Sequence, residues 1–152
     1  MLVSTKGRYG LRMMIDIARN QENGKVTLRS IGERQGISIK YLEQLARALC
    51  TADLLSGCRG QGGGYTLARS ADQITAGDIL RAVEGSTAPV YCLVHERETC
   101  KRRDMCETNK FWLGLEEAID VYVNSVSLSD LVRDCSDRPT LPGPCLGVSS
   151  GV

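Results

Sequence analysis

The chain has 152 residues, the length of one domain with an extra helix and a tail, and its 42% hydrophobic and 24% charged residues are close to the averages of globular proteins. No apolar run approaches the roughly 20 residues of a membrane span, and the first residues lack the pattern of a signal peptide, so we expect a cytoplasmic protein with no membrane partner. The net charge of +1 is unevenly distributed. Residues 1–69 have eleven Lys and Arg against five Asp and Glu, a balance of +6, and residues 70–152 have eight against thirteen, a balance of −5. A basic first half indicates either a phosphate-binding surface or a solvated surface with opposite charges on its two halves.

The first predicted helix covers residues 9–20. Its apolar residues recur at the i, i+3, i+4 and i+7 positions of one helical face. Ser4 or Thr5 would cap its start. We expect this helix to bury Leu11, Met14, Ile15 and Ala18.

Two more helices, joined by a short turn, follow. The first, over residues 27–35, has Thr27 as N-cap and Gly36 as terminator, and Ser38 caps the second. Two helices joined by a short glycine turn predict a helix-turn-helix. The second helix would bury Leu42, Leu45, Ala46 and Leu49. Its other face carries long hydrogen-bonding side chains, which suit either base edges and phosphates or an ordinary solvated surface. The candidate DNA-contacting residues here are Ser38, Lys40, Tyr41, Glu43 and Gln44, beside Arg47.

A predicted hairpin comes next, with strands over residues 54–59 and 65–68. Four glycines among the five intervening residues allow positive φ and close approach to a surface. A phosphate-binding loop is excluded, because a strand follows the glycines instead of a helix beginning with Lys. After a helix-turn-helix, such a hairpin is typical of a wing that enters a DNA groove. The candidate contacts in it are Arg59, Gly60 and Gln61.

A cysteine-bearing loop follows a fourth predicted helix, over residues 75–83. Cys92, Cys100 and Cys106 have the spacing Cys-x7-Cys-x5-Cys, without the close Cys pair of structural zinc sites. Wide spacing suits an iron–sulfur cluster, but zinc, redox thiols and incidental cysteines stay open. The nearest candidates for a fourth ligand are His95 and Asn109, and Asp104 and Glu107 are weaker oxygen donors. Cys50 is expected to be a core residue.

The remaining chain predicts a helix over residues 108–124 that is apolar on more than one side, a pattern that favours dimerisation. A short helical turn covers residues 127–132. The predicted fold class is mainly α with a small β-hairpin. We expect a winged helix-turn-helix domain over residues 1–84, a cluster-binding loop over 85–107, a dimerisation helix region over 108–134, and a Pro- and Gly-rich disordered tail over 135–152.

Taken together, residues 4–10, 37–45, 59–65 and 74–79 and the three cysteines before Trp112 resemble the IscR-type regulators of the Rrf2 family, to which CymR and NsrR also belong. The resemblance extends to about residue 133. It implies a homodimer on double-stranded DNA, with each recognition helix in a major groove and each wing at the adjacent minor groove. It also implies that the three cysteines hold a cluster whose presence tunes DNA binding, and that the protein regulates genes for cluster assembly.

One position departs from the IscR pattern, which places His three residues after the last cysteine, where this chain has Asn109. Asparagine is a poor iron ligand beside thiolates, so the fourth ligand stays open between His95 and Asn109. Lys6-Gly7-Arg8 also lacks the acidic ligand of NsrR-like [4Fe–4S] members, and we favour [2Fe–2S] over [4Fe–4S].

Three functional hypotheses remain. The favoured one is a cluster-sensing repressor. The alternative is a cluster-free, CymR-like regulator of sulfur and cysteine metabolism, although CymR-like members lack the cysteine trio. A redox or zinc enzyme is least favoured, because a single His and the absence of a nucleophile–base pair argue against catalysis, and we expect no small-molecule substrate.

Overall fold

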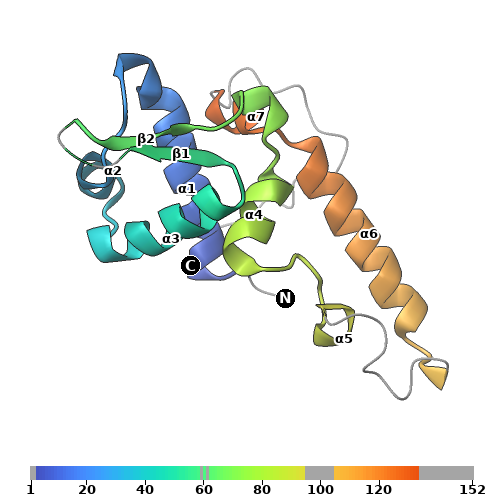
Figure 1. The fold of residues 1–152 in the computed structure, drawn as a ribbon. Helices are drawn as coiled ribbons and strands as arrows, with labels where there is room; N and C mark the ends of the chain where they lie inside the picture. The colour runs from blue at the N-terminus through green and yellow to red at the C-terminus, as the bar shows by residue number, and fades with distance from the viewer. Residues whose placement is uncertain (1–2, 59, 61, 95–104, 134–152) are drawn as a thin grey trace, which may run out of the picture.

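A computed structural model describes residues 3–58, 60, 62–94 and 105–133. Within this part of the chain it contains seven α-helices, two 3-10 turns and one antiparallel hairpin (Figure 1). The predicted class, mainly α with a small hairpin, is therefore confirmed. The predicted tail, residues 135–152, lies outside the described residues. No helix among those described is both long and apolar enough to cross a membrane.

Helix α1 spans Thr5–Asn20 and begins four residues earlier than predicted, because Ser4 Oγ accepts a hydrogen bond from Lys6 N at 3.0 Å and caps the helix there. The prediction of its buried face was partly wrong. Of the four predicted residues only Met14 is fully buried, and the other three are half-buried, whereas Met13 and Ile17, which were not predicted, are fully buried. The face is displaced because α1 is covered by several elements at once, among them α4, α7, β2 and α2. The half-buried residues are Leu11, Ile15 and Ala18.

Helices α2 (Leu28–Gln35) and α3 (Ile39–Thr51) form the predicted helix-turn-helix. Thr27 Oγ1 accepts a hydrogen bond from Ser30 N at 3.1 Å, and Ser38 Oγ accepts one from Tyr41 N at 3.3 Å. Gly36 ends α2 at φ 65°, a left-handed conformation in which a Cβ would be strained. The four apolar residues predicted for α3 are all buried: Leu42, Leu45, Ala46 and Leu49.

The hairpin consists of β1 (Leu55–Cys58) and β2 (Gly64–Leu67), with Leu55 opposite Leu67 and Cys58 opposite Gly64. Strand β2 is attached to the α1–α2 connection, since Val26 N donates to Tyr65 O at 2.9 Å and Tyr65 N donates to Val26 O at 2.8 Å. A Cβ on Gly64 would lie 2.9 Å from Val26 O. This glycine therefore allows two backbones to approach closely within the protein.

Helix α4 (Ala76–Glu84) packs against α1 and leads toward a short helix, α5 (Tyr91–Val94). The loop predicted over residues 85–107 thus contains one helical turn that periodicity could not reveal, because four residues are too short to show a period. Helix α6 (Asn109–Ser125) extends away from the helix-turn-helix body (Figure 1). The chain then returns to that body through α7 (Leu128–Val132), where Leu128 N donates to Ile74 O at 2.7 Å.

Candidate nucleic-acid interface and cysteine segment

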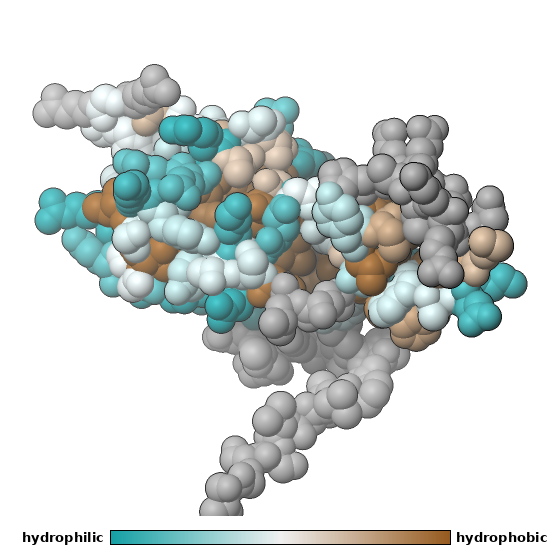
Figure 2. All heavy atoms as spheres, turned by 90° about the horizontal axis from the view of Figure 1, so that it is seen from below, coloured by the Kyte–Doolittle hydropathy of each residue, from teal (hydrophilic) through white to brown (hydrophobic). Residues whose placement is uncertain are grey.

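The outer face of α3 is polar and open to solvent. Four of the five predicted contacts on this helix and its cap are exposed: Ser38, Lys40, Glu43 and Gln44, and Arg47 is exposed beside them. Figure 2 views the molecule from below, and hydrophilic and pale side chains cover most of the left part of this face, where Figure 1 places α2 and α3. The helix therefore offers a contiguous polar surface on a rigid element.

Tyr41 lies differently from the other predicted contacts. It is half-buried and packs edge-to-face on Tyr9, with ring centroids 5.7 Å apart. The guanidinium of Arg12 lies 5.3 Å from the Tyr9 ring centroid, within cation–π range. The body of Tyr41 thus joins α3 to α1.

A buried carboxylate fixes the orientation of the helix-turn-helix on α1. Asp16 is only 3% exposed. It accepts hydrogen bonds from Arg34 Nε at 3.0 Å and from Gln35 Nε2 at 2.9 Å, both near the end of α2. Burial alone would raise the pKa of the Asp16 carboxyl, but the hydrogen bonds from Arg34 and Gln35 and the charge of Arg34 outweigh it, so the pKa lies below its ordinary value.

Asp16→Asn should lower the free energy of unfolding by about 2 kcal/mol at neutral pH, since it weakens charge-assisted hydrogen bonds to a buried acceptor. The folded-state pKa is depressed, so this contribution is present above the unfolded-state pKa of about 4 and is lost as the pH falls through the lower folded-state value. Urea unfolding at several pH values checks this. A stability difference between the two proteins that stayed constant below pH 4 would contradict it.

The tip of the hairpin makes use of two glycines in left-handed conformations, Gly60 at φ 98° and Gly62 at φ 77°. Gly63 N donates to Gly60 O at 2.9 Å and closes the turn. The other two predicted wing contacts, Arg59 and Gln61, lie outside the described residues. Their DNA contacts stay predictions, and of the three only Gly60 can be placed at the tip.

A polar groove separates α3 from the hairpin. It is lined by side chains from both elements, including Glu43, Arg47, Thr51, Cys58 and Tyr65. Thr51 and Cys58 were not among the predicted site residues. Glu43, Arg47 and Thr51 follow one another at intervals of four, so helical spacing could have placed Thr51 on this face. No local pattern marked Cys58, which reaches the groove through strand pairing.

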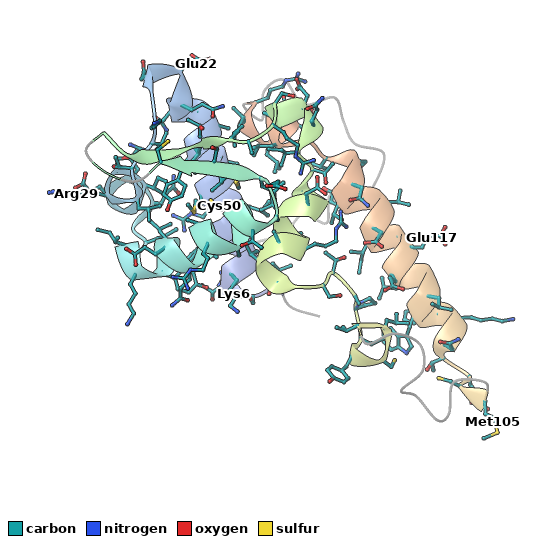
Figure 3. All side chains as sticks on the ribbon, in the orientation of Figure 1. Lys6, Glu22, Arg29, Cys50, Met105 and Glu117 are labelled. Carbon is teal, nitrogen blue, oxygen red and sulfur yellow. The ribbon has the colours of Figure 1, made fainter. Side chains whose placement is uncertain are left out.

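The described cysteines occupy two environments. Cys92 on α5 and Cys106 before α6 are exposed, whereas Cys50 is half-buried against the core, as expected. Burial raises the pKa of the Cys50 thiol and disfavours the thiolate that binds metals. Figure 3 shows Cys50 within the body and Met105, the neighbour of Cys106, at the far end of α6.

The predicted cluster ligands are only partly visible. Cys100 and His95 lie outside the described residues, and Asn109 is the half-buried first residue of α6. Among residues that can be described, no three His, Cys, Asp or Glu side chains are gathered as for a metal ion. The donor chemistry nevertheless suits an iron–sulfur cluster, because Cys92 and Cys106 are exposed cysteines on either side of the segment that carries Cys100.

Helix α6 leaves much of its apolar surface uncovered. Among its residues only Val123 is buried, while Phe111 is 64% and Tyr122 is 56% exposed. Phe111 and Tyr122 are eleven positions apart, which is about three helical turns, so they lie on one face. Tyr122 also lines an apolar groove formed by residues of α4, the following segment and α6, among them Leu80, Ala88 and Ile119.

Comparison with known sequences places the chain among transcription regulators. The Rrf2 family, described as an iron-dependent transcriptional regulator, matches residues 3–134. The chain is 39% identical over 143 residues to the HTH-type transcriptional regulator IscR of Cronobacter sakazakii, covering 91% of this chain and 87% of that protein. It is 40% identical over 139 residues to the protein rrf2 of Nitratidesulfovibrio vulgaris, covering 91% and 92% of the two chains.

Solved structures agree. The structure of CymR, the global cysteine regulator of B. subtilis, is 38% identical with a TM-score of 0.70, covering 87% of this chain and 96% of that one. IscR of T. potens is also 38% identical, with a TM-score of 0.69 and coverage of 87% and 86%. These relatives are regulators, so the enzyme hypothesis is set aside. The chain belongs to the Rrf2 family of transcription regulators.

Proposed function

We propose that this chain is a homodimeric repressor whose binding to a double-stranded DNA operator is tuned by an iron–sulfur cluster, with [2Fe–2S] favoured over [4Fe–4S]. Cys92, Cys100 and Cys106 would hold the cluster, with His95 or Asn109 as candidates for the fourth position. The observation that carries this proposal is the exposure of Cys92 and Cys106 on either side of the segment with Cys100. Relatives named IscR support it, and we infer a role in controlling genes for cluster assembly.

The DNA-binding role in this proposal falls to the first 84 residues. The polar face of α3 would read the major groove, with the hairpin residues Arg59, Gly60 and Gln61 at the neighbouring minor groove. The excess of basic residues over positions 1–69 supports contact with phosphates. The Asp16 network and the Tyr9–Tyr41 contact hold α3 against α1, so the reading face is presented by a rigid body.

The homodimer in this proposal would form through residues 108–134. A two-fold dimer uses the same surface patch on both subunits, so one part of the patch must be complementary to another part. The exposed apolar face of α6 and the adjacent apolar groove could supply two such parts, the face of one subunit packing into the groove of the other. The cysteine segment, residues 85–107, lies in the sequence between α4, at the end of the DNA-binding part, and α6. A change at the cluster could therefore reach both the dimer contact and the placement of the recognition helices.

Within the proposed interface, Lys40→Ala should weaken binding to all DNA sequences. It should also reduce the slope of the logarithm of affinity against the logarithm of salt concentration by about one, the contribution of one phosphate contact. Glu43→Ala should instead change sequence preference by about 1–3 kcal/mol at one base pair, because a carboxylate can accept from cytosine N4. Binding-site selection and salt titration separate the two effects. If the Glu43 variant selects the same operator as the unmodified protein, Glu43 is a surface residue only.

The cluster itself is tested by purification without oxygen. We expect a red-brown protein whose iron and acid-labile sulfide match one cluster per chain, and whose operator affinity changes when the cluster is removed. A colourless protein that still binds its operator would favour the CymR-like alternative. That alternative has one observation in its favour, since the fold is as similar to CymR as to IscR.

A further inference from the structure

Thr108 occupies an unusual position at the start of α6. It is the N-cap residue of that helix, yet its side chain makes no capping hydrogen bond. The side chains of the corresponding residues of α1, α2, α3, α4 and α7 each accept a hydrogen bond from a backbone N–H of their own helix. Threonine at an N-cap normally does the same. The Thr108 hydroxyl is therefore directed to other partners.

Those partners are a cysteine sulfur and an indole. Thr108 Oγ1 lies 3.5 Å from Cys106 Sγ, and Trp112 Nε1 donates to the same oxygen at 3.2 Å. Trp112 packs edge-to-face on Phe111, with ring centroids 4.9 Å apart, so its ring has a second contact that helps to orient it. The three groups form a chain from indole N–H through hydroxyl to sulfur.

The direction of that chain follows from the donors and acceptors. An indole N–H can only donate, so the Thr108 oxygen accepts from Trp112. A cysteine that binds iron does so as a thiolate, which has no proton and can only accept. With Cys106 as a ligand, the contact between oxygen and sulfur must therefore be O–H donating to S. The bond from Trp112 polarises the hydroxyl and strengthens this donation.

We propose that Thr108 is a positioning residue for the cluster, donating a hydrogen bond to the Cys106 sulfur, with Trp112 supporting it from behind. This inference rests on the proposed cluster at Cys92, Cys100 and Cys106. Hydrogen bonds to ligand sulfurs raise the reduction potential of iron–sulfur clusters, because they stabilise the more negative, reduced state. Thr108 thereby sets how readily the cluster is reduced and how firmly it is kept.

The test compares Thr108→Val, Thr108→Ser and Trp112→Phe with the unmodified full-length chain, all purified without oxygen. Ser125→Ala is the matched control, since it removes a hydroxyl from the opposite end of α6, where Ser125 Oγ donates to Tyr122 O at 2.8 Å. The midpoint potential is measured by anaerobic titration followed in visible absorption, and cluster loss in air is timed. We expect T108V to shift the potential to a more negative value and to lose its cluster faster. W112F should shift it less in the same direction, while T108S and S125A should match the unmodified chain.

A second readout needs no cluster. Trp112 is the only tryptophan in the chain, so fluorescence of the cluster-free protein reports on its indole alone. T108V removes the acceptor of the indole N–H and should change the emission, whereas T108S and S125A should not. A cluster with an unshifted potential in T108V, or equal shifts in T108V and S125A, would overturn the inference while leaving the proposed function intact. If T108V holds no cluster, an unshifted midpoint potential in W112F would likewise overturn the inference. An unmodified chain without any cluster would overturn both.

Discussion

Replacing Cys92, Cys100 or Cys106 singly by alanine is expected to abolish the visible absorption of protein purified without oxygen. Thiolates supply most of the affinity for an iron–sulfur cluster, and the available fourth donors, His95 and Asn109, are too weak to replace one. Absorption spectra with iron and sulfide analysis measure the loss. Cys58→Ala is the matched control, because Cys58 is an exposed cysteine outside the cysteine segment. Cys50→Ala should also keep the cluster.

The fold should survive removal of the cluster. Cys92 and Cys106 are exposed, and the core of the DNA-binding part, from Met13 to Val83, is built without them. Circular dichroism and sedimentation of the alanine variants should show a folded dimer with altered operator affinity. Retention of a full cluster after loss of any one cysteine would contradict the ligand set. Unfolding after cluster loss would make the metal structural, and the sensing proposal would fail.

Tyr122→Glu is expected to disrupt the proposed dimer. Tyr122 is 56% exposed on the apolar face of α6, so the isolated chain tolerates a charge there. In a dimer the carboxylate would be buried without a partner, at a cost of several kcal/mol. The dimer dissociation constant should rise at least about a hundredfold, and operator binding should weaken with it. Sedimentation equilibrium over a range of concentrations measures the change.

The control for this variant is Lys110→Gln, which alters the net charge by the same amount at an exposed position on another side of α6. It should leave the dimer intact. Far-ultraviolet circular dichroism verifies that both variants remain folded. If Tyr122→Glu stays dimeric at the same concentrations as the unmodified chain, residues 108–134 do not form the dimer contact through this face.

The helix-turn-helix could be predicted from the sequence because its signals are local. Thr27, Gly36 and Ser38 mark helix ends through hydrogen bonds or backbone angles within three or four residues, and the structure confirms each of them. The buried stripe of α3 also followed from spacing alone. All four ends of the hairpin strands were predicted to within one residue, and the glycine-rich segment between the strands marks their inner ends.

The candidate site was less predictable, because several of its features depend on residues far apart in the chain. Sequence spacing placed Tyr41 on the outer face of α3, but the ring of Tyr9 draws it toward α1. Nothing local marked Asp16 as a buried acceptor, since its partners are eighteen and nineteen residues away. The attachment of the hairpin through Val26 likewise arises from pairing that no short segment encodes.

The start of α1 shows this division most clearly. The sequence by itself determined that Ser4 is a good helix cap, because a hydroxyl can accept from an amide two residues on. Only the tertiary structure placed Glu84 there, eighty residues along the chain, where its Oε1 accepts from Ser4 N at 3.0 Å, Ser4 Oγ at 2.7 Å and Gly7 N at 2.9 Å. A negative charge at a helix N-terminus is stabilising wherever it comes from, but the packing of α4 against α1 decides which carboxylate supplies it.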